Sequence, residues 1–307
     1  MRAKTLLDRT VSGLLFTISG SVILSMGALL AELVIAGHAS MVHFGFSFFL
    51  GHAWDPLRGA YGALPFLFGT AVSAIIGLVI ATVLGLGTAL LLTQYATLRI
   101  IRMIGFLVNL LAAVPSVVYG LWGIFIVVPW LRVTLEPALY RVFGDIPLFA
   151  GARDGVGMLA AGLVLGIMTL PTIAAVVRDV FGAVPNTLRD GALALGATNQ
   201  EMIRMAVLPF ARAGIFGAVM LGLVRALGET MAVLMVIGNQ PSITGSLFAP
   251  AYTLSSAIAS EFAEAASPLY LSALYELGFI LLMLTILIYT LARLLVWRVR
   301  WRGGLPL

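Results

Sequence analysis

The stretch PNTLRDGALALGATNQEMIRMAVLPF, residues 185–210, is polar and rich in helix-forming residues, and long apolar runs lie on both sides of it. Two capping-box patterns, each a hydroxyl followed three residues later by an acid, begin within it at Thr187 and at Thr198. Gly196 stands between them, where a left-handed backbone ends a helix, and Pro209 stands where the next apolar run begins. The stretch therefore predicts a helix, a glycine turn and a second helix between two membrane-spanning segments.

The composition of the whole chain shows what surrounds this polar stretch. Of the 307 residues, 61% are apolar and 10% are charged, whereas about a quarter of the residues in a soluble domain are charged. The chain is therefore predicted to be an all-α membrane protein with several spans. It has no cysteine, which excludes disulfides and thiolate metal sites. The net charge of +5 is explained by basic loops on the cytoplasmic face, so no nucleic acid is expected as a partner.

Six apolar runs are long enough to cross a bilayer, whose roughly 30 Å hydrocarbon core takes about 20 residues of helix. They are Val11–Ile35, Pro65–Leu92, Ile101–Val128, Val156–Val177, Phe210–Ile237 and Leu271–Trp297. Arg2, Lys4 and Arg9 precede the first run, which makes a signal peptide the alternative there. The run is longer than the apolar core of about 7–15 residues found in signal peptides, and this favours a retained helix.

Single residues inside these runs predict local features. Pro115 and Pro129 would break or kink the third run. Gly162 and Gly166 have the spacing that lets two helices pack closely. Glu276 lies near the outer end of the last run, where an interfacial position is expected rather than a role in proton transfer.

The distribution of lysine and arginine orients the helices. If six helices alternate, thirteen basic residues fall on one side: Arg2, Lys4, Arg9, Arg99, Arg102, Arg178, Arg189, Arg204, Arg212, Arg293, Arg298, Arg300 and Arg302. The opposite side has four, which are Arg58, Arg132, Arg141 and Arg153. The positive-inside rule therefore places both termini and residues 185–210 in the cytoplasm.

The three loops on the opposite side are long, at about 36–64, 129–155 and 238–270, and loops beyond roughly 15 residues usually have functions of their own. Phe48 and Trp54 in the first loop are equally explained as membrane-interface anchors or as docking contacts. The three histidines lie in or beside this loop without the spacing of helical metal ligands, so we expect no metal site: His38, His43 and His52.

Lys4 is the only lysine in the chain, and it lies at the extreme N-terminus. A phosphate-binding Walker A loop needs a lysine after a glycine-rich run, between a strand and a helix. The chain therefore has no such loop, and any use of ATP must come from a partner.

Residues 190–209 resemble the EAA loop of ABC importer permeases, which reads Glu-Ala-Ala, three residues, Gly, nine residues, Ile, one residue and Leu-Pro. The matching positions here are Asp190, Gly191, Ala192, Gly196, Ala206, Leu208 and Pro209. The chain departs from the pattern at Asp190, Gly191 and Ala206, and Gly191 costs about 1 kcal/mol of helix stability relative to alanine. In that family the loop docks into a cleft on a separate ATPase subunit and transmits its closure. The resemblance thus implies cytoplasmic coupling helices at about 186–206.

Five further segments, in family order, are similar to phosphate importer permeases of the PstC type. They are YGALPFLFGT (61–70), AVPSVVYGLWGIFIVVP (113–129), RALGETMAV (225–233), YTLSSAIASEFAEA (252–265) and LYLSALYELGFILL (269–282). The resemblance implies one permease domain over residues 1–307, with a type I ABC importer core at about 65–297, in the bacterial inner membrane. It also implies a PstA-type sister permease, two PstB-type ATPases and a periplasmic phosphate-binding protein. ATP and Mg would belong to the ATPase, and the chain itself would be no enzyme and bind no cofactor.

Arg225 and Glu229 are charged residues inside the fifth apolar run, and their spacing of four predicts one helix face. A charge near the bilayer centre costs at least about 2.5–3.5 kcal/mol, so such residues face a cavity or a partner. An intrahelical ion pair that only holds structure is one interpretation. The other is that Arg225 lines an anion path, because guanidinium binds phosphate oxygens in bidentate geometry, with Glu229 orienting it. The resemblance supports the second.

Three alternatives to phosphate import follow from the residues. One arginine does not separate tetrahedral oxyanions, so a sulfate or molybdate importer is one of them. A proton-coupled secondary transporter using Glu229 is another, although many such folds contain two related halves and no internal repeat is evident. A membrane enzyme is the third, but the spans contain no nucleophile–base set.

Overall fold

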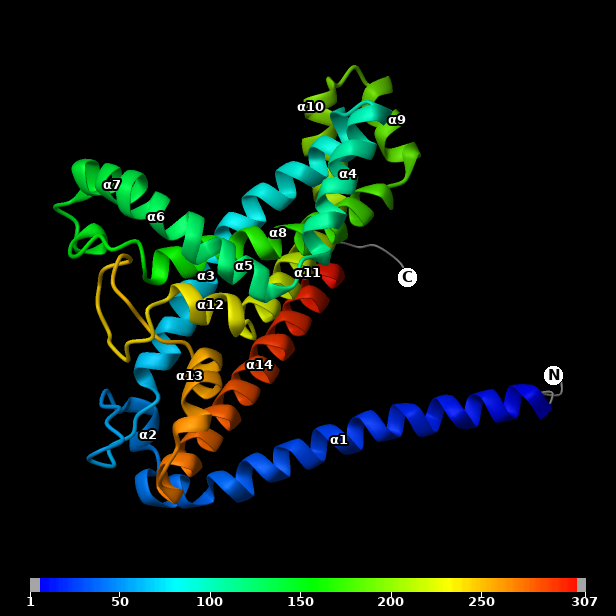
Figure 1. Cartoon of the computed structure of the whole chain (residues 1–307). Coiled ribbons are helices and arrows are strands. Elements are labelled where there is room, and N and C mark those ends of the chain that lie inside the picture. The colour runs from blue at the N-terminus through cyan, green and yellow to red at the C-terminus, as the bar shows by residue number, and fades with distance from the viewer. Residues whose placement is uncertain (1–5, 303–307) are drawn as a thin grey trace.

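The computed structural model describes residues 6–302 of the chain, and side chains within residues 11–297. The described part is mostly helical (Figure 1). Its α-helices are α1 (Leu6–Phe44), α2 (Ser47–Leu50), α3 (Leu64–Leu90), α4 (Leu98–Ala113), α5 (Ser116–Trp122), α6 (Val128–Trp130), α7 (Glu136–Phe143), α8 (Met158–Gly182), α9 (Asn186–Ala194), α10 (Asn199–Met202), α11 (Leu208–Leu227), α12 (Met231–Val236), α13 (Leu254–Glu261) and α14 (Pro268–Arg302). Four π-helical segments connect some of them: Leu91–Tyr95, Gly123–Val127, Leu131–Leu135 and Ile203–Val207. Two short 3-10 turns lie at Pro147–Phe149 and Phe262–Glu264.

Six helical runs in residues 6–302 are long and apolar enough to cross a membrane. They are Val11–Phe44, Leu64–Tyr95, Ser116–Phe143, Met158–Gly182, Asn199–Leu227 and Pro268–Trp297. The prediction of an all-α protein with six spans is thereby confirmed. The third and fifth spans differ from their predicted positions.

Glycines allow α3 and α8 to pack closely at the centre of the molecule. A Cβ atom added to Gly162 would lie 2.4 Å from Cγ2 of Ile76, and one added to Gly166 would lie 2.8 Å from Cβ of Ile80. Real Cβ atoms do not approach other atoms this closely, so the two helices meet at this distance only because α8 has glycine at both positions. The packing role predicted for Gly162 and Gly166 is confirmed.

The helix α1 leaves the body of the molecule, and its N-terminal part projects away from the other helices (Figure 1). Its C-terminal part packs on the beginning of α14, where Ser40 Oγ donates to Glu276 Oε2 at 2.5 Å and Ser40 N–H donates to Ser272 Oγ at 3.0 Å. Glu276 is 2% exposed, so it is buried between α1 and α14, and its interfacial position in a membrane stays a prediction. A carboxyl group is tolerated in this buried position because the hydroxyl of Ser40 supplies a hydrogen bond.

The third run predicted from the sequence, Ile101–Val128, is interrupted by Pro115. Val114 and Pro115 both have extended backbone, with ψ of 128° and 146°, because proline has no N–H to donate and forces the preceding residue out of the α region. The predicted run Ile101–Val128 is therefore wrong: α4 is a separate helix, and the span that follows is Ser116–Phe143. Pro129 does not interrupt this span, since it lies in the first turn of α6 between two π-helical segments.

The fifth span begins and ends earlier than the predicted Phe210–Ile237. The α10 helix continues through a π-helical segment into α11, so that one helical run extends over Asn199–Leu227. Pro209 lies in the first turn of α11, next to the π-helical segment, and such segments accommodate an irregularity without ending a helix. The chain then leaves the helix at Gly228 and resumes it as α12.

The first long loop is held against α13 and α14 by aromatic residues. The ring of Trp54 lies 4.9 Å from that of Tyr61 and 4.7 Å from that of Phe66. Glu261 Oε2 accepts hydrogen bonds from Trp54 Nε1 at 2.6 Å and from the Tyr270 hydroxyl at 2.7 Å. Trp54 thus packs, partly exposed, against residues of this chain, and Phe48, with no exposed surface, is buried within it.

Candidate coupling and translocation sites

The glycine turn predicted within residues 185–210 is present. Gly196 has a φ of +86°, and its N–H donates to the carbonyl of Leu193 at 2.9 Å while the N–H of Ala197 donates to that of Ala192 at 3.2 Å. These two bonds form a Schellman motif, which satisfies the last carbonyls of α9 and reverses the chain. The backbone of Gly196 therefore sets the angle at which α9 and α10 meet.

One of the two predicted capping boxes is confirmed and the other is wrong. Thr198 Oγ1 accepts from the N–H of Glu201 at 3.3 Å, and Glu201 Oε2 accepts from the N–H of Thr198 at 2.8 Å. The first box fails because α9 begins at Asn186, with Pro185 in the capping position and no side-chain cap. Thr187 is thus the second residue of the helix, and its hydroxyl is not in the position that caps the helix N-terminus.

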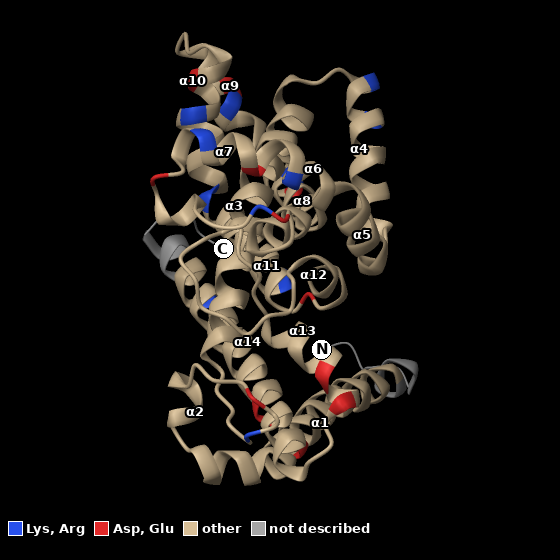
Figure 2. Cartoon of the chain, turned by 60° about the vertical axis from the view of Figure 1, so that its left-hand side comes forward, with Lys and Arg blue, Asp and Glu red and all other residues tan. Residues whose placement is uncertain are grey.

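The tip formed by α9 and α10 presents apolar side chains outward. Leu188 and Leu193 are both exposed, and Leu195 is 91% exposed. Ala192, by contrast, is partly buried against the cluster formed by Met202, Val207 and their neighbours. An apolar patch on a projecting helix pair is typical of an interaction site. Basic residues gather at the same end of the molecule, on α9, in the π-helical segment Ile203–Val207 and at the beginning of α4 (Figure 2).

The remaining residues of the EAA-like pattern lie in different surroundings. Asp190 and Gly191 are exposed, and a Cβ atom added to Gly191 would meet no atom within 4 Å. Leu208 is partly buried and packs on the same cluster as Ala192, whereas Pro209 is exposed. The pattern thus combines residues that hold the two short helices to the bundle with residues that remain free to contact a partner.

Arg189 connects α9 to two membrane-spanning helices. Its Nη2 donates to the carbonyl of Phe181 in the last turn of α8 at 2.6 Å, and its Nη1 lies 3.5 Å from Gln94 Oε1 at the end of the α3 run. The carbonyls of the last helical turn are unpaired within the helix and carry partial negative charge, so a guanidinium is well placed there. From the sequence, Arg189 has no predicted role beyond its place on the basic side.

Arg225 and Glu229 lie on either side of a break in the helix rather than on one helical face. The α11 helix ends at Leu227, and Glu229 stands in the non-helical segment before α12. Glycine at position 228 explains the break, because glycine stabilises a helix less than any residue except proline. Among the side chains of residues 11–297, no acidic group lies within 4.0 Å of the Arg225 guanidinium, so the ion pair predicted from the spacing is absent.

Glu229 instead contacts the helices that follow it. Its Oε1 accepts from the N–H of Ala232 at 3.4 Å in the first turn of α12, and its backbone carbonyl accepts from Ser255 Oγ at 2.8 Å. A carboxylate is favoured at a helix N-terminus by the helix dipole. The exposed Arg225 is thereby left without a hydrogen bond or an ion pair in the described part of the chain.

A buried hydroxyl cluster supports this break from the α13 side. Thr253 and Ser256 form a capping box at the start of α13, and the N–H of Leu254 donates to Thr70 Oγ1 of α3 at 2.9 Å. Ends of three discontinuous helices, α11, α12 and α13, therefore meet beside α3. Discontinuous membrane helices of this kind form substrate sites in transporters.

Known proteins identify the chain. It is 43% identical, over 92% of its length and 88% of the relative, to the phosphate transport system permease protein PstC of Mesorhizobium japonicum. It is 44% identical, over 92% of its length and 89% of the relative, to the protein of the same name from Pasteurella multocida. The chain belongs to the PstC family. No family model matches it.

Solved structures show which fold the chain has. A chain of the MetNI methionine ABC transporter, in an inward-facing conformation, has a TM-score of 0.54 and 22% sequence identity over 78% of this chain and 94% of the solved one. A second crystal form of the same transporter has a TM-score of 0.55 and 20% identity. At this identity the likeness is one of fold, and it confirms the ABC transporter permease fold predicted from the sequence.

Proposed function

We propose that this chain is the transmembrane subunit of an ATP-driven phosphate importer in a bacterial inner membrane. The observation that carries this proposal is the identity of 43–44% to PstC permeases over 92% of the chain. Membership of that family favours phosphate over sulfate or molybdate, and favours an ABC permease over a proton-coupled transporter. The chain acts as a permease and not as an enzyme.

The proposed complex contains an ATPase and a substrate-binding protein, because the relatives are named as permeases of a phosphate transport system. In finer detail we expect a PstA-type sister permease, two PstB-type ATPases that use ATP and Mg, and a periplasmic phosphate-binding protein. The tip formed by α9 and α10, with its exposed Leu188 and Leu195, is the surface that fits the ATPase. Both chain termini and this tip lie in the cytoplasm in this arrangement.

The contacts of Arg189 suggest how movement of the ATPase reaches the membrane. A displacement of α9 pulls on the last turn of α8 through the bond to Phe181, and on the end of the α3 run through Gln94. The helices α3 and α8 are closely packed at their glycines, so they move together rather than separately. Arg189 is thus a positioning residue that joins the coupling helix to the two central helices.

Arg225 is proposed to bind phosphate oxygens during transport. Its guanidinium is exposed and has no protein partner in the described residues, and Glu229 is engaged at the beginning of α12. An unpaired guanidinium is available for bidentate contact with a tetrahedral oxyanion. Glu229 accepts a hydrogen bond from the first turn of α12 instead of pairing with Arg225.

Uptake of labelled phosphate tests the proposal. The chain is expressed with its transport partners in a strain that lacks its own phosphate importer, and uptake is measured with and without an excess of sulfate or molybdate. Phosphate uptake that neither anion reduces is the expected result. Efficient competition by sulfate or molybdate would overturn the assignment of phosphate as the substrate.

A further inference from the structure

A groove lies between α11 and α14, on the part of α11 that precedes Arg225 and the break at Gly228. It has a volume of about 340 Å³, which is within the range of roughly 300–1,000 Å³ found for small-molecule sites. Its walls include Gly217, Leu221 and Val224 from α11 and Tyr289, Arg293 and Val296 from α14. A Cβ atom added to Gly217 would meet no atom within 4 Å, so the α11 wall is open at that point.

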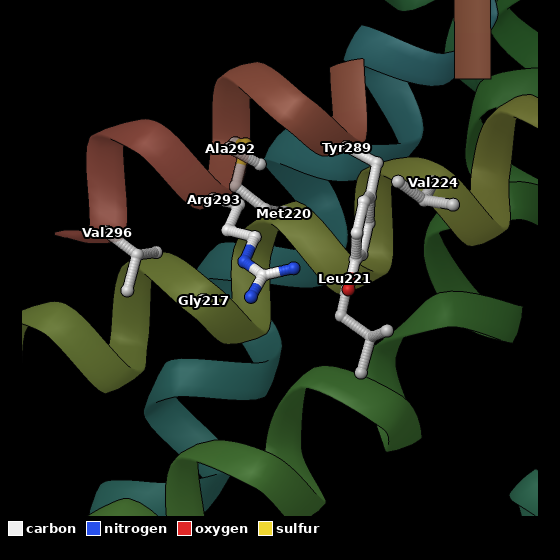
Figure 3. Close-up of a pocket in the computed structure, with 8 residues that line it drawn as sticks. All are labelled: Gly217, Met220, Leu221, Val224, Tyr289, Ala292, Arg293 and Val296. Atoms are coloured by element: carbon white, nitrogen blue, oxygen red, sulfur yellow. The ribbon is translucent and has the colours of Figure 1, made fainter. Parts of the chain in front are cut away.

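Arg293 is the charged residue of this otherwise apolar groove. Its side chain and that of Tyr289 reach from α14 across α11 and lie side by side along the groove (Figure 3). Arg293 is exposed and has no acidic partner among the side chains of residues 11–297. A guanidinium in an apolar membrane region requires a counter-charge, or a route to the headgroup layer along its own flexible side chain.

The position of the groove along the two helices places its charged end toward the predicted cytoplasmic surface. The helices α11 and α14 run in opposite directions, and Arg293 lies four residues before Trp297, the last residue of the apolar span. Four residues of helix correspond to about 6 Å. Tyr289, at the other end of the groove, lies nearer the middle of the α14 span. The groove thus leads from the headgroup region into the hydrocarbon region.

We propose that this groove binds an anionic phospholipid of the cytoplasmic leaflet. The headgroup phosphate contacts the Arg293 guanidinium, the Tyr289 hydroxyl is available as a second donor, and one acyl chain lies against Gly217 and Leu221. Basic pockets between membrane helices on the cytoplasmic side bind anionic lipid headgroups by this combination of charge and apolar contact. The proposal goes beyond the transport function and does not depend on it.

Two other occupants fit the groove less well. Free phosphate would lose its hydration between apolar walls while gaining only one guanidinium. A helix of a sister permease would have to bring an acidic group to Arg293, whereas every anionic lipid of the leaflet carries a phosphate at the required depth. A lipid therefore matches both the charge and the shape of the groove.

Lipid retention by the full complex tests the proposal. The complex is purified from cells, exchanged into nanodiscs of phosphatidylcholine with a small fraction of phosphatidylglycerol, and the phosphatidylglycerol retained per complex is measured by native mass spectrometry. Arg293→Gln is expected to lower retention about fivefold, since one arginine near an anionic membrane surface contributes about 1 kcal/mol. Gly217→Leu, which fills the groove, should lower retention as well. Arg141→Gln, at an exposed arginine of α7 on the opposite side of the membrane, is the matched control and should leave retention unchanged.

A fluorescent probe distinguishes lipid from protein in the same groove. The chain has no cysteine of its own, so Val224→Cys allows one bimane label at the inner end of the groove. We expect brominated phosphatidylglycerol to quench this label more strongly than brominated phosphatidylcholine at equal mole fraction, and Arg293→Gln to remove the difference. Equal quenching by the two lipids, unchanged retention in Arg293→Gln, or a cross-link from position 224 to the sister permease would overturn the proposal.

Discussion

The helical run Asn199–Leu227 begins and ends in two different ways. At its beginning, the turn at Gly196 and the capping box at Thr198 are made by neighbouring residues, with hydrogen bonds that span three to five positions. At its end, the break beyond Leu227 is supported by residues from distant elements, including Ser255 and Thr70. The first end is the exposed tip formed by α9 and α10, called the lever below. The second is the place where the ends of α11, α12 and α13 meet, called the interior junction below. The comparison teaches that the proposed coupling helices are positioned by local turn chemistry, whereas the proposed transport path is formed where three helix ends meet.

Arg225→Ala provides the strongest test of the interior junction. Removing the guanidinium should reduce phosphate uptake by about 100-fold, because the phosphate loses its charged partner in the proposed path. Uptake is measured in whole cells, and co-purification of the partner subunits shows whether the complex still assembles. Arg212→Ala, an exposed arginine of the same helix, is the control and should transport normally. Normal uptake by Arg225→Ala in an assembled complex would show that Arg225 is not needed for phosphate transport.

Ala192→Glu tests whether coupling depends on the packing of α9 against the bundle. Ala192 is partly buried where α9 packs on the bundle, and a bulky charge there should displace α9 and cost more than about tenfold in transport per ATP hydrolysed. The ratio is measured in reconstituted complexes, with Ala192→Ser as the conservative control. An unchanged amount of transport per ATP hydrolysed would show that the packing of α9 against the bundle does not control coupling.

Arg189→Ala tests the connection between the lever and the central helices. Charge-assisted hydrogen bonds contribute about 1.5–3 kcal/mol, so loss of the bond to the Phe181 carbonyl should reduce transport per ATP hydrolysed by roughly tenfold while ATP hydrolysis continues. Arg204→Ala, an exposed arginine of the same segment, is the matched control. If hydrolysis and transport fall together in Arg189→Ala, the arginine supports folding rather than coupling.

Gly191→Ala should have the smallest effect. A methyl group at this position meets open space, and alanine stabilises a helix by up to about 1 kcal/mol relative to glycine. Slower hydrogen exchange of the α9 amides is therefore expected, with uptake at or slightly above the original level. Faster exchange would show that α9 requires the flexibility of glycine.

Much of the fold and part of the candidate sites follow from the sequence. Hydrophobic length predicts six spans, and the residues around Gly196 predict a helical turn. The same reasoning places a continuous helix through Gly228, because apolar composition reports burial in lipid and not continuity of the backbone. At Pro115 the sequence does predict a break or kink, although it does not show that a separate helix, α4, precedes it. The hydrogen bond that Glu229 accepts from Ala232 and the contacts of Arg189 are also not predicted from the sequence. Their partners are set by packing between separate helices, which spacing along the chain does not record.

The length of α1 has a consequence for how the chain lies in a membrane. Its apolar part, Val11–Phe44, contains 34 residues, which correspond to about 51 Å of helix. A hydrocarbon layer of roughly 30 Å is much thinner, and membrane helices tilt by about 20° on average. The hydrophobic mismatch is met by a steep tilt, by helix ends that emerge from the hydrocarbon layer, or by both. Because Ser40 donates to Glu276, the C-terminal part of α1 is fixed on α14, and the tilt of α1 about this contact decides how much of its apolar length lies within the hydrocarbon layer.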